Sequence, residues 1–200
     1  NGLAVPSISA VPMNFEGATE ENADVYDVEK AKEYLAASNV DPASIELAII
    51  CSDDTKKRAG EVIQANLKEI GINATIESMD LATYLSVTTE GNFTAAIGGY
   101  SSSNLLGYVV GVYHSDSINA SNKTRLNNPE VDALIDKAKE TLDPAERKVI
   151  MEELSALLNE LCSQAPLWQP VSMRAYAAGL QGVQVSDSGT LYFEDCYWAE

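Results

Sequence analysis

The stretch that decides the fold is residues 45–51, IELAIIC, an almost continuous apolar run of strand length. Strands of this kind are typical of parallel sheets that are covered on both faces. Residues 53–71, DDTKKRAGEVIQANLKEIG, follow with apolar side chains at helical spacing and a glycine suited to end a helix. Residues 72–78, INATIES, then alternate apolar and polar side chains as a strand does. The succession predicts two parallel strands joined by a helix.

The same pattern continues on both sides of this segment. Asp80 precedes a short helical segment that Gly91 ends, and residues 93–99, FTAAIGG, have the composition of another buried strand. Upstream, Asp27 predicts the start of a short helix that runs to about Asn39. The order strand, helix, strand, helix, strand predicts an α/β fold with a mainly parallel sheet, helices on its faces and right-handed crossovers.

The remainder of the chain predicts two further helices and then strands. The run NNPEVDALIDKA has an Asn-Pro start typical of a helix, and DPAE at residues 143–146 resembles a capping box that opens a long helix. The final section contains APLWQPVSM and short apolar runs ending at LYFEDCYW, which we expect to be strands. We therefore expect an extended entry segment at residues 1–25, an α/β core at 26–165 and C-terminal strands at 166–200.

Length and charge limit the classes of function. The chain has 200 residues, which suits one domain or one lobe of a larger protein. Its net charge of −17 argues against binding to nucleic acid or to anionic membranes, and its acidic residues are spread along the chain like those of a solvated surface. No apolar run is long enough to predict a transmembrane helix. The first residues carry no signal peptide, so the targeting segment of an exported protein would lie outside this sequence.

The sequence offers little for catalysis or metal binding. A Ser-His-acid triad would have to use His114, the single histidine, but the sequence has no serine in a GxSxG motif. We therefore interpret His114 as an imidazole on the surface or in a loop. The three cysteines predict neither a zinc site nor a disulfide framework. We interpret Cys51 and Cys162 as small buried side chains and leave a bridge between Cys162 and Cys196 open. Standard phosphate-binding loops are absent, so we expect no enzyme, no metal and no cofactor.

Two pairs of acidic residues have simple structural interpretations. Asp53 and Asp54 follow the first predicted strand and could bind a cation, but acids commonly cap a helix that starts at such a position. Asp132 and Asp136 lie four residues apart on one helix face, where a solvated helix surface explains them better than an acid–base pair.

The most informative position is the loop after the third predicted strand, GGYSSSNLLGY, because open α/β sheets bind ligands beyond the carboxyl ends of their strands. Its aromatic ring and uncharged donors and acceptors belong to Tyr100, Ser101, Ser102, Ser103 and Asn104. Taken alone, this stretch fits a turn that caps a helix somewhat better than it fits a ligand contact. Trp168 and Gln169 are a second candidate pair, although core packing is the favoured interpretation of Trp168.

Seven stretches, weak singly, follow one another in an order and spacing that resemble a single family. They are the VP...VPMN of the opening segment, YDVEKAKEYLAAS, AGEVIQANLKEIGINATIE, TAAIGGY, NNPEVDALIDKA, DPAERKVIMEEL and APLWQ. Together they span roughly residues 5–180 and resemble the extracellular solute-binding proteins of peptide-type ABC transporters, the oligopeptide- and dipeptide-binding group called family 5.

The resemblance implies a periplasmic-binding-protein-like fold, of which this chain would be the C-terminal lobe alone because family members are much longer. Members close two lobes around a peptide or a related solute and deliver it to a membrane permease, without catalysing a reaction. The implied partners are the ligand, the N-terminal lobe of the same protein and an ABC permease. The implied location is extracellular or periplasmic, with the full-length bacterial lipoprotein anchored to the membrane. Residues 166–200 would return toward the missing lobe.

One departure from the family bears on the ligand. Peptide-binding relatives commonly close the third strand with a Trp and carry, three residues later, an Asp that pairs with the amino terminus of the peptide. Tyr100 and Ser103 occupy these positions here, and a hydroxyl cannot supply the charge-assisted bond. The resemblance thus favours ligand contact at Tyr100, with a neutral or hydroxyl-rich ligand as plausible as a peptide. The alternative function is a ligand-sensing domain of a regulator with the same fold.

Overall fold

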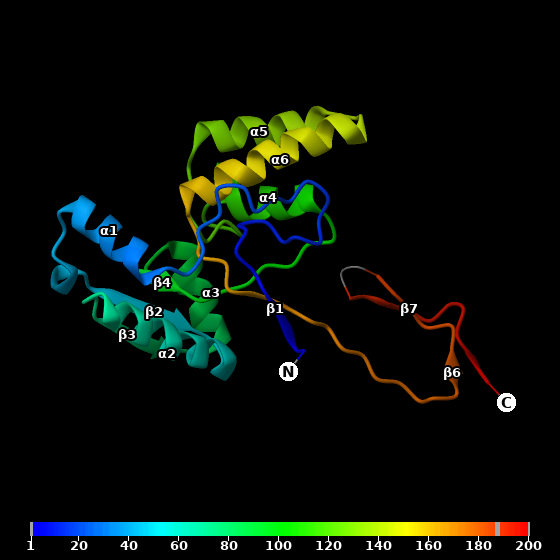
Figure 1. The fold of residues 1–200 in the computed structure, drawn as a ribbon. Coiled ribbons are helices and arrows are strands. Elements are labelled where there is room, and N and C mark those ends of the chain that lie inside the picture. Colours follow the sequence, from blue (N-terminus) through cyan, green and yellow to red (C-terminus); the bar gives the residue numbers. More distant parts are fainter. Residues whose placement is uncertain (1, 187–188, 200) are drawn as a thin grey trace. The chain divides into compact units, whose positions relative to one another are not determined.

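The computed structural model describes residues 2–186 and 189–199 (Figure 1). Their packing defines two compact units, which are treated separately below. Unit 1 comprises the described parts of residues 1–24, 101–114 and 128–200, and unit 2 comprises residues 25–100 and 115–127. The chain therefore leaves unit 1 for unit 2 twice, and both units are assembled from segments that are distant in sequence.

Unit 2 is built on a parallel sheet, as the sequence predicts. Strands β2 (Leu47–Cys51), β3 (Ala74–Ser78) and β4 (Ala95–Ala96) lie in the order β3-β2-β4. In this register Ile49 of β2 lies opposite both Ile76 and Ala95. The third strand is shorter than the seven-residue stretch that the sequence predicts, because its pairing stops where the glycines begin.

Three helices accompany this sheet: α1 (Val28–Ser38), α2 (Asp54–Glu69) and α3 (Leu81–Glu90). Each begins after an aspartate whose carboxylate accepts hydrogen bonds from backbone N–H groups of the first turn. Helix α2 lies along the sheet (Figure 1), and its apolar face packs on a core cluster of Ile49, Ala74 and Ile97. Two short 3-10 helices, η1 (Pro42–Ser44) and η2 (Ser115–Ser117), complete the unit.

Unit 1 is a layer of helices with an apolar interior. Its helices are α4 (Leu105–Tyr113), α5 (Pro129–Glu140) and α6 (Pro144–Leu161), and α5 packs against both others (Figure 1). The predicted starts of α5 and α6 are confirmed, since each has an acceptor cap followed by proline. The large, fully buried side chains of these helices are Val109, Tyr113, Val131, Ile135, Leu154 and Leu158.

Helix α4 is absent from the sequence-based expectations. Its sequence, LLGYVVGVY, is apolar all round, so it has no polar face to reveal a helical period, and its glycines and valines do not favour a helix. It forms because six of its nine residues are buried. No helix in the described part of the chain is long and apolar enough to cross a membrane.

Short strands connect the opening segment to the region after α6, and others pair within the C-terminal segment. The predicted extended opening contains β1 (Ala4–Pro6), which pairs antiparallel with β5 (Trp168–Pro170). Further along, β6 (Leu180–Gln181) pairs with β9 (Tyr197–Trp198), and β7 (Gln184–Val185) pairs with β8 (Leu191–Tyr192). The C-terminal strands expected from the sequence thus form, as one three-residue ladder and two two-residue ladders.

The opening segment is fastened to α6 by a buried amide. The Asn159 side chain accepts a hydrogen bond of 2.7 Å from Ala10 N and donates to Thr19 O and Glu21 O. On α4, the Tyr113 hydroxyl donates to Ala10 O at 2.7 Å. These bonds satisfy backbone groups of an irregular segment that would otherwise be costly to bury.

The cysteines give one confirmation and one correction. All three are free, and Cys51 is buried as expected. The expectation that Cys162 is buried is wrong, because the residue follows the last turn of α6 in a left-handed conformation (φ 46°) and its side chain is exposed.

Candidate ligand-binding site

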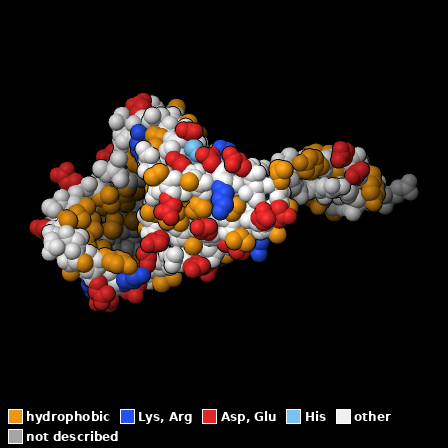
Figure 2. All heavy atoms as spheres, turned by 90° about the horizontal axis from the view of Figure 1, so that it is seen from above, with side chains coloured by type: hydrophobic (Ala, Val, Ile, Leu, Met, Phe, Trp, Pro, Cys, Tyr) orange, Lys and Arg blue, Asp and Glu red, His pale blue; other side chains and the backbone are white. Residues whose placement is uncertain are grey.

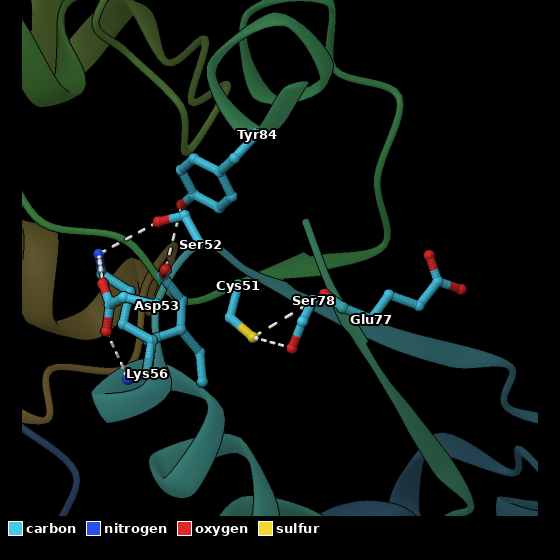
Figure 3. A network of polar contacts seen from close by, with 8 residues as sticks. Cys51, Ser52, Asp53, Lys56, Glu77, Ser78 and Tyr84 are labelled. Carbon is cyan, nitrogen blue, oxygen red and sulfur yellow. Dashed lines mark hydrogen bonds and ion pairs between the residues drawn. The ribbon is translucent and has the colours of Figure 1, made fainter. Parts of the chain in front are cut away.

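The carboxyl edge of the unit 2 sheet carries a set of polar and aromatic side chains (Figure 3). Strand β2 ends at Cys51 and β3 at Ser78, and the chain leaves β4 through two glycines to Tyr100, which is 44% exposed. Open α/β sheets bind ligands at this edge. Tyr100 therefore lies at the sheet edge at which the sequence places it.

The loop that follows β2 at this edge stabilises the start of α2. The Lys56 ammonium lies 2.5 Å from an Asp53 carboxylate oxygen and 3.4 Å from the Ser52 hydroxyl (Figure 3). The hydrogen bond from Lys56 lowers the pKa of the Asp53 carboxyl, which also accepts a backbone bond at the start of α2. Asp53 is thus a helix cap paired with a lysine, in agreement with the capping interpretation.

Beside it, a tyrosine from α3 contacts the end of the third strand. Tyr84 is buried, and its hydroxyl donates a hydrogen bond of 3.2 Å to Ile97 O. Burial raises the pKa of the Tyr84 hydroxyl, and the nearby Cys51 and Asp53 raise it further, so the hydroxyl keeps its proton at neutral pH. Sequence reasoning missed this residue, because nothing in the local pattern links a helix position to a carbonyl thirteen residues later.

The hydroxyl-rich part of the loop belongs to unit 1 and forms the start of α4. The Asn104 side-chain oxygen accepts a hydrogen bond of 2.7 Å from Gly107 N, which makes it the N-cap. The Ser102 hydroxyl donates to Asn104 O at 2.9 Å. The capping turn that the sequence favoured is therefore present. Ser101 and Ser103 lie exposed beside it, and the Ser103 hydroxyl accepts a hydrogen bond of 3.4 Å from the Asn104 amide.

The second candidate pair, Trp168 and Gln169, lies in β5 of unit 1. Both side chains are half-buried, and Trp168 lies opposite Pro6 in the β1–β5 ladder. The Gln169 amide donates a hydrogen bond of 3.1 Å to the Asn14 side-chain oxygen. These two residues are thus held against the opening segment of the chain.

His114 is not the surface or loop imidazole that the sequence suggested. It caps the end of α4 and is 6% exposed, with Nε2 at 3.5 Å from an Asp136 oxygen and Nδ1 at 4.0 Å from an Asp132 oxygen. A hydrogen bond from Lys139 is the main cause of the lowered pKa of Asp136. The two aspartates therefore have cationic or imidazole neighbours. Among the described residues, no group of His, Cys, Asp and Glu side chains is arranged to hold a metal ion.

The candidate loop differs from the rest of the molecule because it lies in a stretch without charged side chains. Residues 91–115 contain no Asp, Glu, Lys or Arg, although 22% of the chain is charged. Elsewhere, acidic side chains are scattered over the face that Figure 2 shows. The polar groups of this loop are hydroxyls, an amide and backbone groups, which recognise neutral polar or aromatic parts of a ligand.

A parallel sheet whose carboxyl edge leads into an uncharged loop is the arrangement of a ligand-binding protein of the periplasmic type. The model of the bacterial extracellular solute-binding proteins, family 5 (middle region), matches residues 1–119, and the chain belongs to this family. The resemblance predicted from the sequence is confirmed. So is the prediction that the chain is not an enzyme, and an extracellular or periplasmic location follows for the family.

Curated relatives agree with this assignment. Heme-binding protein A of Haemophilus influenzae is 32% identical over 182 residues, which cover 86% of this chain and 32% of the relative. Di/tripeptide-binding protein 4 of Pseudomonas aeruginosa is 24% identical, over 92% of this chain and 36% of the relative. The chain therefore spans about a third of the length of these relatives.

Solved structures confirm the predicted fold class. HbpA2 from Haemophilus parasuis superimposes with a TM-score of 0.87 and 21% identity, over 100% of this chain and 41% of that one. DppA from Helicobacter pylori in complex with the peptide STSA gives a TM-score of 0.84 and 22% identity, over 100% and 40% of the two chains. Both likenesses place the chain in the periplasmic-binding-protein fold.

Proposed function

We propose that this chain is the C-terminal portion of a solute-binding protein that captures a small ligand without catalysis and presents it to an ABC permease in the membrane. The observation that carries the proposal is the family match over residues 1–119, joined to an α/β fold that superimposes over the whole chain on a peptide-bound neighbour. The relatives give no support to the alternative of a regulator's sensing domain.

The proposed ligand contacts come from the candidate loop and from β5. They are Tyr100, Ser101, Ser102, Ser103 and Asn104, with Trp168 and Gln169. Tyr100 supplies an exposed ring on which a flat or apolar group can stack, and Ser101 and Ser103 supply exposed hydroxyls.

The ligand remains a peptide or another small solute, and the loop favours groups without charge. Ser103 stands where peptide-binding relatives commonly have an aspartate for the amino terminus, so this chain lacks that ion pair. Among the relatives, one is named for heme and another for di- and tripeptides. We therefore propose that the part of the ligand next to Tyr100 is neutral or aromatic.

The other proposed partners are an N-terminal lobe of the same protein and a membrane anchor that holds the full-length protein near its permease. The chain covers only about a third of its curated relatives, which leaves room for such a lobe. The C-terminal segment supports this, because exposed apolar side chains are concentrated there. They are Val171, Met173, Tyr176, Val185, Tyr192, Phe193, Tyr197 and Trp198. Burying such a surface against a second lobe is favourable.

Native mass spectrometry of the whole protein, purified without unfolding, tests the proposal. We expect a bound small molecule in the wild type and a reduced bound fraction in Tyr100→Ala. The matched control is Tyr34→Ala, which removes a similarly exposed ring (57% against 44%) from α1 of the same unit. A correctly folded protein that binds neither peptides, sugars nor heme would contradict the proposed function.

A further inference from the structure

We propose that Tyr84 is a positioning residue for the ligand loop, because its buried hydroxyl fixes the point at which the chain leaves β4 toward Tyr100. The inference rests on the proposed function of that loop. All the residues that carry it, from Tyr84 to Tyr100, belong to unit 2.

The end of the third strand is held from two sides. Ile97 N donates a hydrogen bond of 3.0 Å to Ile50 O, which continues the pairing with β2. On its other side, Ile97 O accepts the bond of 3.2 Å from the Tyr84 hydroxyl (Figure 3). Because Tyr84 is only 7% exposed, water competes little for this bond. The peptide unit between Ile97 and Gly98 is therefore oriented by α3.

Gly98 shows how closely this hydroxyl approaches the chain. A Cβ at Gly98 would lie 2.7 Å from the Tyr84 hydroxyl oxygen and 4.0 Å from its Cζ. The backbone of Gly98 is not in the left-handed region, so glycine is needed here for space and not for its dihedral angle. The hydroxyl oxygen occupies the place that any other side chain would need.

The close contact is confined to this one position. A Cβ at Gly99 would meet no atom within 4 Å, although Gly99 is adjacent in sequence. Tyr84 therefore fixes the departure of the loop at Gly98, two residues before the exposed ring of Tyr100. Fixing a binding loop in advance removes part of the entropy cost of ordering it when the ligand binds.

The consequence is that the two residues should be energetically coupled. Gly98→Ala should be costly while the tyrosine oxygen is present, since methyl and oxygen would overlap. In the Tyr84→Phe background that oxygen is gone, and the nearest remaining ring atom lies 4.0 Å from the new Cβ. The destabilisation caused by Gly98→Ala should then largely disappear. If Tyr84 and Gly98 did not interact, Gly98→Ala would have the same effect in both backgrounds.

The first experiment measures amide hydrogen exchange at Ile97, whose N–H donates to Ile50 O, in the whole protein without ligand. The four proteins are wild type, Tyr84→Phe, Gly98→Ala and the double variant, with Tyr34→Phe as the control that removes an exposed hydroxyl. We expect Tyr84→Phe to speed exchange about fivefold, the effect of losing one hydrogen bond. Gly98→Ala should speed it in the wild-type background and add little to Tyr84→Phe. Unchanged exchange in Tyr84→Phe, or the same effect of Gly98→Ala in both backgrounds, would overturn the inference.

The second experiment measures the affinity of the same whole proteins for two probes, haemin and the peptide STSA. For a probe that the wild type binds, Tyr84→Phe should weaken binding about fivefold, and Tyr34→Phe should not change it. A loosened loop with unchanged affinity would overturn the positioning role. A wild type that binds neither probe counts against the proposed function, and the exchange measurement then still decides whether Tyr84 holds the loop.

Discussion

The two ends of the candidate loop are held by different kinds of contact. In unit 2, the end at Ile97 is held by Tyr84, thirteen residues earlier on another helix. In unit 1, the end at Asn104 is held by its own side chain and that of Ser102, over at most three residues. The first depends on how α3 packs, whereas the second forms with the first turn of α4. Local bonds are therefore expected to survive changes that disrupt the tertiary one.

The largest expected effect comes from deleting the ring of Tyr84. Tyr84→Ala should lower the free energy of unfolding by about 3 kcal/mol, because it removes a buried aromatic side chain and leaves a cavity. Tyr100→Ala should change it by no more than about 0.5 kcal/mol, since that ring is 44% exposed. Urea unfolding of the two variants measures the difference, and equal losses would show that the Tyr84 ring contributes no more packing energy than the exposed ring of Tyr100.

A smaller effect is expected at the other end. Asn104→Ala should cost about 1 kcal/mol of unfolding free energy, since it removes the acceptor for Gly107 N. Asn104→Asp should retain most of the stability, because a carboxylate accepts the same bond and suits the start of a helix. Ser101→Ala is the control at an exposed neighbour. If the alanine and aspartate variants unfolded at the same urea concentration, the cap would not be the feature that holds this end.

A smaller effect, on ligand affinity and not on stability, is expected at Ser103. Ser103→Asp should raise the affinity for a peptide with a free amino terminus about threefold, as expected for an exposed ion pair. The affinity for the same peptide after acetylation should not rise, because the ammonium is then absent. Isothermal titration with STSA in both forms checks this, and equal gains would mean that the carboxylate does not meet the amino terminus.

The last effect is a pH dependence that should distinguish the two ends. Asp80 caps α3, which carries Tyr84, and the hydrogen bond from the Thr83 hydroxyl lowers the pKa of the Asp80 carboxyl. Because its folded pKa lies below the unfolded value, Asp80 contributes stability above the unfolded pKa and loses it as pH falls through the folded pKa. Asn104, which caps α4, does not titrate.

Unfolding of Asp80→Asn and wild type at neutral and acidic pH checks this dependence. The wild type should be the more stable at neutral pH, and the difference should fade below pH about 4. Asn104→Ala should differ from wild type by a similar amount at both pH values. A difference between Asp80→Asn and wild type that did not fade in acid would contradict the assigned cause of the pKa shift.

The contrast between local contacts and contacts of distant segments also explains how much of the structure could be predicted from the sequence. Helix starts with an acceptor cap, such as Asp53 and Asn128, were predicted correctly because a cap acts on the next few residues. The parallel sheet followed from apolar runs separated by an amphipathic helix. Helix α4 escaped prediction because burial, and not a local pattern, makes it a helix.

The features of the candidate site and of His114 that the sequence did not predict also depend on contacts between distant segments. The loop could be located because it follows a predicted strand, but the role of Gly98 depends on a hydroxyl from α3. His114 was misplaced because its neighbours Asp132 and Asp136 come from a different helix. Contacts between distant segments leave no periodic signal in a single sequence.

Asn159 also determines when the parts of this protein can fold during synthesis. Its amide bonds to Ala10, 149 residues earlier, so the opening segment of unit 1 has no partner on α6 until that helix has left the ribosome. The helices and strands of the unit 2 sheet, by contrast, are complete once Tyr100 has emerged. We expect the nascent chain to fold its sheet first, and residues 2–24 to pack onto α6 only after that helix has emerged.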